Sequence, residues 1–219
     1  MAIRQAAMAL FGVAAIAASG CTRAGQDAGA GAASSTAAAG KPLAITQVKS
    51  KGALMVVSSP VFADGGPIPD IYTAYGKGYS PPVMWTPVPG AKSYAVVIED
   101  PDAPGRVPFV HWLVYDIPLT VTALDDPSQG GALPAGARQG TSSAGQVAYS
   151  ALKPPVGDKA HRYHVEVFAL DAPPQLSGTP DLASVVRAMA GHVLAAGETV
   201  GVYKAGPPSP GGVADPATD

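Results

Sequence analysis

Short apolar segments separated by turn-forming residues occupy the middle of this chain. The clearest is 93–100, in which Tyr94, Val96 and Ile98 would share one face of a strand while the other face is also apolar. Similar patterns predict further strands at 44–48, 54–58, 83–86, 110–115, 162–170 and 199–203. Strands that are apolar on both faces fit the centre of covered sheets, so the pattern favours a β-sandwich.

One later segment has helical rather than strand periodicity. After Asp181, which suits a helix N-cap, apolar side chains recur at helical spacing, namely Leu182, Val185, Val186, Met189 and Val193. A single late helix beside several strands does not fit alternating βαβ units. We therefore predict an all-β dominated fold, an antiparallel two-sheet β-sandwich with a C-terminal helix and small helical decorations.

Composition narrows the function classes. Charged residues make up 14% of the 219 residues, while glycine and proline number 26 and 23, which suits a loop-rich β fold. The formal net charge is −2 and no run of Lys or Arg occurs, so a nucleic-acid partner is not expected. Cys21 is the one cysteine, which excludes an internal disulfide and a multi-cysteine metal site.

The first residues have the pattern of an export signal. Residues 1–20 combine a basic start with a short apolar run and are expected to be a signal peptide of lipoprotein type. The run ends in Ala18-Ser19-Gly20-Cys21, which resembles a bacterial lipobox and implies cleavage before Cys21 and lipidation there. The alternative is a general secretory signal with an incidental cysteine. Thr22 follows, and by resemblance to the bacterial sorting pattern we expect a lipid-anchored protein of the cell envelope, in the outer membrane or at the cell surface or periplasm.

Low-complexity segments flank one expected domain. Residues 21–40 are mostly Ala, Gly, Ser and Thr and are expected to form a flexible tether. Residues 205–219 are rich in Pro and Gly and are expected to be a disordered tail. The folded domain is therefore predicted at 41–204.

Histidines and proline-flanked acids are the side chains that could carry chemistry. Asp100 and Asp102 stand beside prolines, which restrict the backbone. His161 and Tyr163 are two apart in an expected strand and would share a face. Strand alternation places His111 among apolar neighbours, on the face of Phe109, Leu113 and Tyr115. Together the histidines and acids could build a small pocket in which imidazole N–H groups bind an anion.

The spacing of these motifs resembles the phosphatidylethanolamine-binding protein family, in particular its bacterial branch of Raf-kinase-inhibitor-like proteins. The motifs are Asp100-Pro-Asp-Ala-Pro, His111-Trp112, Asp116-Ile-Pro, Tyr149…Pro154-Pro155-x-Gly157 and His161-Arg162-Tyr163. Further agreement comes from Ser80-Pro81-Pro82-Val83-Met84-Trp85, Gly191-His192-Val193-Leu194-Ala195 and Gly201-Val202-Tyr203. The resemblance covers roughly 68–203 in matching order.

The resemblance implies a β-sandwich with a small anion pocket at one end. The residues that it places around the pocket are Asp100, Asp102, His111, Pro154, Pro155, His161 and Tyr163. In this arrangement Asp100 would accept a ring N–H from His111, and Tyr163 would add a hydroxyl. The chain departs from the family at Ala151 and Leu152, where Gly and Pro are usual, so we expect Leu152 and Lys153 to add bulk at the pocket rim. Lys153 could also attract an anion.

We therefore expect a lipid-anchored binding protein for a small anionic ligand of phosphate or phospholipid-headgroup type, not an enzyme, with no cofactor and no metal. Its expected partners are this ligand and, through the N-terminal lipid, a membrane. The alternative is an inhibitor or regulator of a partner protein such as a kinase or serine protease. A metal-dependent enzyme using Asp100, Asp102, His111 and His161 is a third and weaker alternative.

Overall fold

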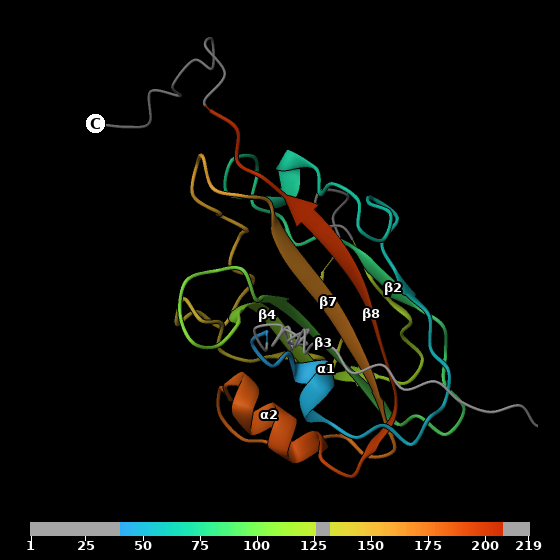
Figure 1. The fold of residues 1–219 in the computed structure, drawn as a ribbon. Helices are drawn as coiled ribbons and strands as arrows, with labels where there is room; N and C mark the ends of the chain where they lie inside the picture. Colours follow the sequence, from blue (N-terminus) through green and yellow to red (C-terminus); the bar gives the residue numbers. More distant parts are fainter. Residues whose placement is uncertain (1–39, 126–131, 208–219) are drawn as a thin grey trace, which may run out of the picture. The chain divides into compact units, whose positions relative to one another are not determined.

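The structure, a computed structural model, describes residues 40–125 and 132–207 (Figure 1). The predicted signal peptide, the lipidation site at Cys21, nearly all of the expected tether and most of the expected tail lie outside the described residues.

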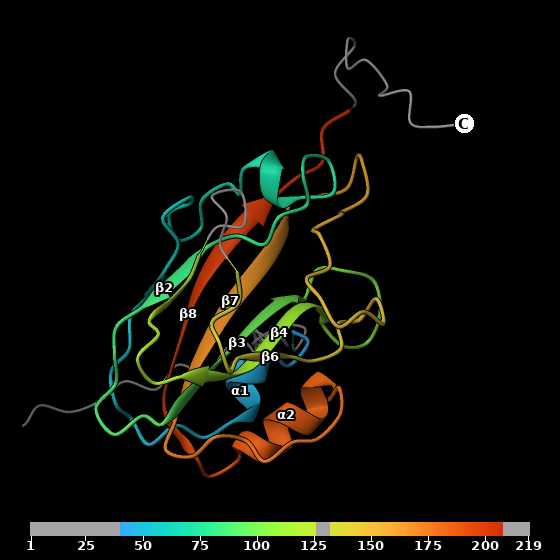
Figure 2. The ribbon, with the colours of Figure 1, turned by 180° about the vertical axis from the view of Figure 1, so that it is seen from behind.

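The described residues form two antiparallel sheets (Figures 1 and 2). The larger sheet has the strand order β6-β4-β3-β7-β8 and the smaller one β1-β2-β5. The strands are β1 Val57–Ser58, β2 Val83–Trp85, β3 Ser93–Asp100, β4 Phe109–Pro118, β5 Ala123–Leu124, β6 Arg138–Gln139, β7 His161–Leu170 and β8 Val193–Tyr203. The helical elements are α1 Ala44–Gln47, α2 Leu182–Met189 and a 3-10 turn at Asp70–Tyr72. Every strand pairing within the two sheets is antiparallel, which confirms the predicted fold class.

Two hydrophobic layers cover the opposite faces of the larger sheet. Tyr94, Val96 and Ile98 of β3 belong to a core shared with the smaller sheet. Ala95 and Val97 point the other way and pack with α1 and α2. In Figures 1 and 2, both helices lie on one side of the larger sheet and β2 on the other. The alternation read from segment 93–100 is therefore confirmed, and it explains why β3 is buried along its whole length.

Helix α2 begins where its N-cap predicts and ends earlier than its apolar spacing predicts. The Asp181 carboxylate accepts a hydrogen bond from the Ser184 amide at 2.9 Å, which satisfies a free N–H of the first turn. Gly191 then adopts a left-handed backbone with φ of 81°. The chain leaves the helix there, so Val193 is the first residue of β8 rather than a helical residue.

The predicted strand at 44–48 is wrong, because this segment forms the short helix α1. Two buried carboxyls explain the difference. The Ala44 amide donates to Glu99 at 2.6 Å, and the Ile45 amide donates to Glu166 at 2.9 Å. Consecutive free amides that point in one direction are a property of a helix start, so the acids on β3 and β7 select the helical conformation.

Burial changes the acidity of both carboxyls. Burial raises the pKa of Glu99 to about 7. Burial, together with the charge of Glu99, raises the pKa of Glu166 to about 9. At neutral pH Glu166 is therefore protonated in the folded protein, whereas a glutamate in an unfolded chain is ionised.

We expect the folded domain to lose stability as pH rises, and Glu166→Gln to remove much of that loss. The folded state holds a proton on Glu166 that the unfolded state has released above about pH 4.5, so folding is penalised increasingly up to about pH 9. The slope is up to about 1.4 kcal/mol per pH unit for one proton. Chemical unfolding at several pH values measures it, with Asp125→Asn as the control for loss of an exposed carboxylate. An equally steep alkaline loss in Glu166→Gln would contradict this account.

Candidate ligand-binding site

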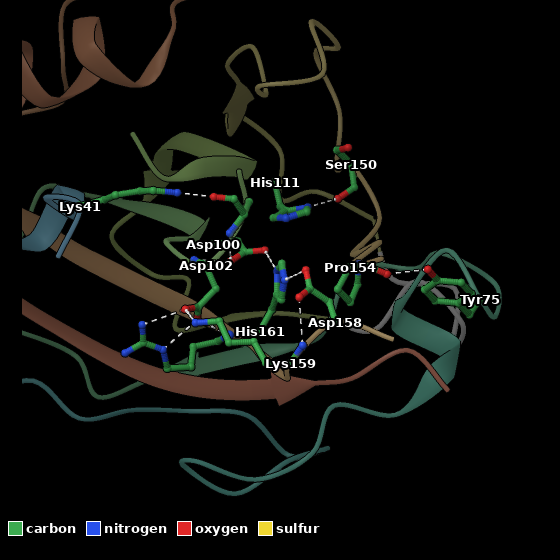
Figure 3. Close-up of polar contacts among 12 residues, drawn as sticks. Lys41, Tyr75, Asp100, Asp102, His111, Ser150, Pro154, Asp158, Lys159 and His161 are labelled. Atoms are coloured by element: carbon green, nitrogen blue, oxygen red, sulfur yellow. Dashed lines mark hydrogen bonds and ion pairs between the residues drawn. The ribbon is translucent and has the colours of Figure 1, made fainter. Parts of the chain in front are cut away.

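A cavity of about 340 Å³ lies at the end of the larger sheet where β3 ends and β4 and β7 begin. The antiparallel topology brings these three strand ends together, although they are far apart in sequence. The cavity is lined by Asp100, Ala103, Pro104, Phe109, His111, Ser150, Ala151, Lys153, Pro154, Pro155 and His161. Figure 3 shows the two histidine rings near the Asp100 carboxylate. Both histidines that the sequence singles out therefore belong to one cavity.

A β-bulge directs His111 toward this cavity. In the β3–β4 ladder Ile98 pairs with Trp112 and Glu99 pairs with Val110, so His111 is the extra residue between them. Its ring contacts those of Phe109 and Tyr163, with centroids 4.7 and 5.5 Å away. The expectation that His111 shares a face with Leu113 and Tyr115 is wrong, because those two side chains pack on the helix-covered face.

The His111 ring is buried and held by the neighbouring loop. Its Nδ1 lies 2.7 Å from the backbone oxygen of Ser150, which can only accept, so Nδ1 carries a proton. Burial lowers the pKa of His111. The ring is therefore neutral at pH 7, and its Nε2 is a hydrogen-bond acceptor until the ring is protonated.

Asp100 orients His161, not His111 as the resemblance implied. The Nδ1 of His161 lies 2.8 Å from one Asp100 carboxylate oxygen, and both side chains are buried. The other oxygen accepts the amides of Asp102 and Ala103, at 2.8 and 2.9 Å. Asp100 thus fixes both the ring and the loop that follows β3. The Nε2 of His161 makes one long contact, 3.5 Å to the exposed Asp158.

Asp102 does not line the cavity. Its carboxylate accepts from the Arg162 side chain at 2.8 Å and from Lys159 at 2.7 Å (Figure 3). The Arg162 side chain is the largest cause that holds the pKa of Asp102 well below its usual range. Asp102 therefore connects the loop after β3 to the start of β7. It contributes to the site by fixing the positions of these two segments, not by contacting the cavity.

Tyr163 is not on the cavity wall either. The side chain is fully buried under the two histidines, stacked on the His161 ring at 6.4 Å. Its hydroxyl has no hydrogen-bond partner among the described residues. Because the residue contacts both rings, it supports them from below rather than presenting its hydroxyl to the cavity.

The loop before β7, residues 149–160, is the second loop of the site and forms the opposite wall of the cavity. Pro154 and Pro155 line the cavity, and the hydroxyl of Tyr75 donates to the Pro154 oxygen at 2.6 Å. Ala151 and the exposed Lys153 also line it. Leu152 does not add bulk at the rim as expected, because its side chain is fully buried in the core between the sheets. Its backbone oxygen accepts the Ala74 amide at 2.9 Å, which ties the loop down.

Sequence reasoning missed several members of the site. Phe109 was expected on the face of His111 but not among the pocket residues, and Ser150 was not singled out, although both contact His111. Phe109 precedes the histidine by two positions, which was a usable signal. The contact with Ser150 uses a backbone oxygen, which every residue type has, so the sequence does not indicate it. The other two histidines lie elsewhere: His164 bonds Glu198 at 2.8 Å, and the exposed His192 bonds Asp171 at 2.7 Å.

Comparison with known proteins identifies the family. The family described as phosphatidylethanolamine-binding protein matches residues 58–204. A UPF0098 protein of Methanothermobacter thermautotrophicus is 39% identical over 154 residues, covering 69% of this chain and 100% of the relative. The chain belongs to the phosphatidylethanolamine-binding protein family. A UPF0098 protein of Aquifex aeolicus is 40% identical to this chain over 157 residues, covering 70% of this chain and 90% of the relative.

Solved structures of the phosphatidylethanolamine-binding protein family agree with the fold. A homolog from Chlamydia trachomatis matches with a TM-score of 0.64 and 33% identity, covering 70% of this chain and 99% of that one. YbcL of E. coli, described as a member of the mammalian family, matches with a TM-score of 0.64 and 32% identity, covering 69% of this chain and 98% of that one. The family and fold predictions are confirmed, and the chain is a member of a family of binding proteins.

No helix in the described part of the chain is long and apolar enough to span a membrane. The described residues also contain no group of three or more His, Cys, Asp or Glu side chains arranged to hold a metal ion.

Proposed function

We propose that the cavity between His111 and His161 binds a small anion, such as the phosphate of a phospholipid head group or of a free phosphate ester. The observation that carries the proposal is that each ring gives its Nδ1 to a protein acceptor, Ser150 or Asp100. Each Nε2 is then the nitrogen left for a ligand, and it becomes a donor once the ring is protonated.

The rest of the cavity suits an anion. Lys153 adds a positive charge and forms no ion pair with any residue that the structure describes. Phe109, Pro154 and Pro155 make an apolar wall, and charge interactions are stronger where water is excluded. The Asp158 carboxylate beside His161 occupies the position that a ligand oxygen would take. An incoming anion displaces it from His161, and the exposed Asp158 side chain keeps its other hydrogen bond, from the Lys159 amide at 3.1 Å.

We expect anion affinity to rise as pH falls. Burial lowers the pKa of His111, so the free ring is protonated only below its ordinary value of about 6.5, and binding an anion draws a proton onto it. Linkage then allows up to a tenfold gain in affinity per pH unit for each proton taken up, roughly. Sulfate is the probe for calorimetry between about pH 8 and pH 5.5, because it stays a dianion throughout and, unlike phosphate, does not titrate there. Affinity that stays constant or rises with pH would overturn the proposed site.

We also propose that Cys21 carries a lipid that anchors the protein in the cell envelope. The support is the match of Ala18-Ser19-Gly20-Cys21 to a lipobox and the small-residue composition of 21–40. A flexible segment of that length spans about 25 Å on average, enough to let the domain reach lipid head groups. In a bacterial host the full chain is expected in the membrane fraction and Cys21→Ala in the soluble fraction, with Thr22→Ala as the control. Membrane association that survives Cys21→Ala would exclude the anchor.

A further inference from the structure

A second cavity, of about 310 Å³, lies on the helix-covered face of the larger sheet. No residue lines both this cavity and the histidine cavity. Its apolar wall includes Val110 of β4 and Leu182 and Val186 of α2. The strand geometry links the two sites: Asp100 serves the histidine cavity, and Glu99, the preceding residue of β3, faces the opposite side.

Glu99 is the buried polar group of this cavity. The residue is 1% exposed, and its Oε2 accepts the Ala44 amide at 2.6 Å. That amide is the one hydrogen-bond partner of the carboxyl within the described part of the chain, so Oε1 has no protein donor. Because Glu99 lines the cavity, Oε1 is the carboxyl oxygen that a ligand in the cavity or a proton can satisfy.

The charges around the cavity have one sign. Its lining holds the carboxyls of Glu99 and Asp181 and no Lys, Arg or His. The Asp181 carboxylate caps α2 and is otherwise exposed. Glu166 of β7, on the same face of the sheet, adds a third acid near Glu99, and His164, which pairs with Glu99 across the ladder, is bound to Glu198.

We propose that this cavity is a second ligand site, which takes a small organic ammonium ion. The ammonium group donates to the free oxygen of Glu99, with Asp181 adding negative charge, and the apolar body of the ligand packs on Val110, Leu182 and Val186. An ammonium bonded to a carboxylate supplies the missing donor and neutralises the buried charge in one step.

The two cavities respond to pH in opposite directions. Burial raises the pKa of Glu99 to about 7, so this carboxyl is largely neutral at pH 5.5 and ionised at pH 8.5. Burial favours the protonated form of Glu99, and the Ala44 amide of α1 favours the ionised form. Of the acids that face it, Glu166 has a pKa raised to about 9 and is still protonated where Glu99 ionises, and Asp181 is a further acid of the cavity lining. Ammonium binding therefore strengthens as pH rises through about 7, whereas anion binding at the histidine cavity weakens.

Benzylammonium, benzyl alcohol and benzoate are the probes for this cavity. They have nearly the same size and shape but are cationic, neutral and anionic, so their affinities show the effect of ligand charge alone. We expect benzylammonium to bind at about pH 8.5 and to lose roughly tenfold or more in affinity at about pH 5.5 and in Glu99→Gln. The Gln side chain still accepts from Ala44 and turns an amide N–H₂ toward the ligand. Benzoate should not bind this cavity, and benzyl alcohol should bind weakly at both pH values.

A second variant tests the cavity by blocking it, without changing Glu99. Ala183 is an exposed residue of α2 that lines the cavity, so Ala183→Trp should block it without touching the core. Both variants should keep sulfate binding at the histidine cavity, which also shows that they are folded. Benzylammonium binding unchanged in Ala183→Trp, or unchanged in a sulfate-binding Glu99→Gln, would overturn the second site. So would benzoate binding of equal affinity that Ala183→Trp abolishes, because that binding would lie in the second cavity and not in the histidine cavity.

Discussion

His161→Ala is expected to weaken sulfate or phosphate binding by roughly tenfold to a hundredfold, because a hydrogen bond to a charged group contributes about 1.5–3 kcal/mol. The loss has two sources. The ligand loses the Nε2 donor, and the Asp100 carboxylate beside the cavity loses its hydrogen bond with Nδ1 of the ring. Calorimetric titration at about pH 6 measures the change, and a thermal melt confirms that the variant is folded.

Two matched variants show whether the effect belongs to the cavity. His192→Ala removes an exposed histidine that also bonds an aspartate, so it should leave the affinity unchanged. Asp158→Asn should change affinity in the opposite direction, raising it by roughly twofold to fivefold, because it removes a competing carboxylate at the surface. Equal losses in His161→Ala and His192→Ala would mean that the histidine cavity is not the binding site.

Leu152→Ala should cost about 2–5 kcal/mol of unfolding free energy, the usual range for truncating a fully buried leucine. The side chain fills part of the core between the sheets, and its backbone anchors the second loop through Ala74. Removing it leaves a void that the surrounding strands can only partly close. Denaturant unfolding of the variant and the wild type at one pH measures the difference.

Lys153→Ala is the control for Leu152. Lys153 is exposed at the cavity, so its loss should lower anion affinity while leaving the unfolding free energy within about 0.5 kcal/mol. If Leu152 stood at the rim, as the sequence alone implied, Leu152→Ala would change affinity and not stability. That result would contradict the packing described above.

Strands β3 and β7 were predicted almost to their bounds because their apolar patterns are long, whereas only the end of β8, at 199–203, was predicted. In segment 93–100 successive side chains point to opposite faces of the strand. Both the bounds and the two apolar faces read from the sequence match β3. The start of α2 was predictable for a different reason, since an N-cap is a local interaction between Asp181 and Ser184.

What sequence could not predict depends on contacts between distant segments. The four residues of α1 are helical because Glu99 and Glu166 accept their amides, and those acids are 55 and 121 positions away from their donors. The bulge at His111 changes which face the ring uses without changing any residue type. The partner of Asp100 likewise follows from how β3 and β7 align, which no local motif records.

The Nε2 signals of the histidine rings test the central claim most directly. The chain has four histidines, so ¹⁵N-labelled imidazoles give their own internal controls during a titration with phosphate. We predict that His111 and His161 shift together with one dissociation constant, while His164 and His192 stay in place, because only the first pair lines the cavity. No shift of His111 and His161 at millimolar phosphate, or a shift confined to His164 or His192, would contradict the account.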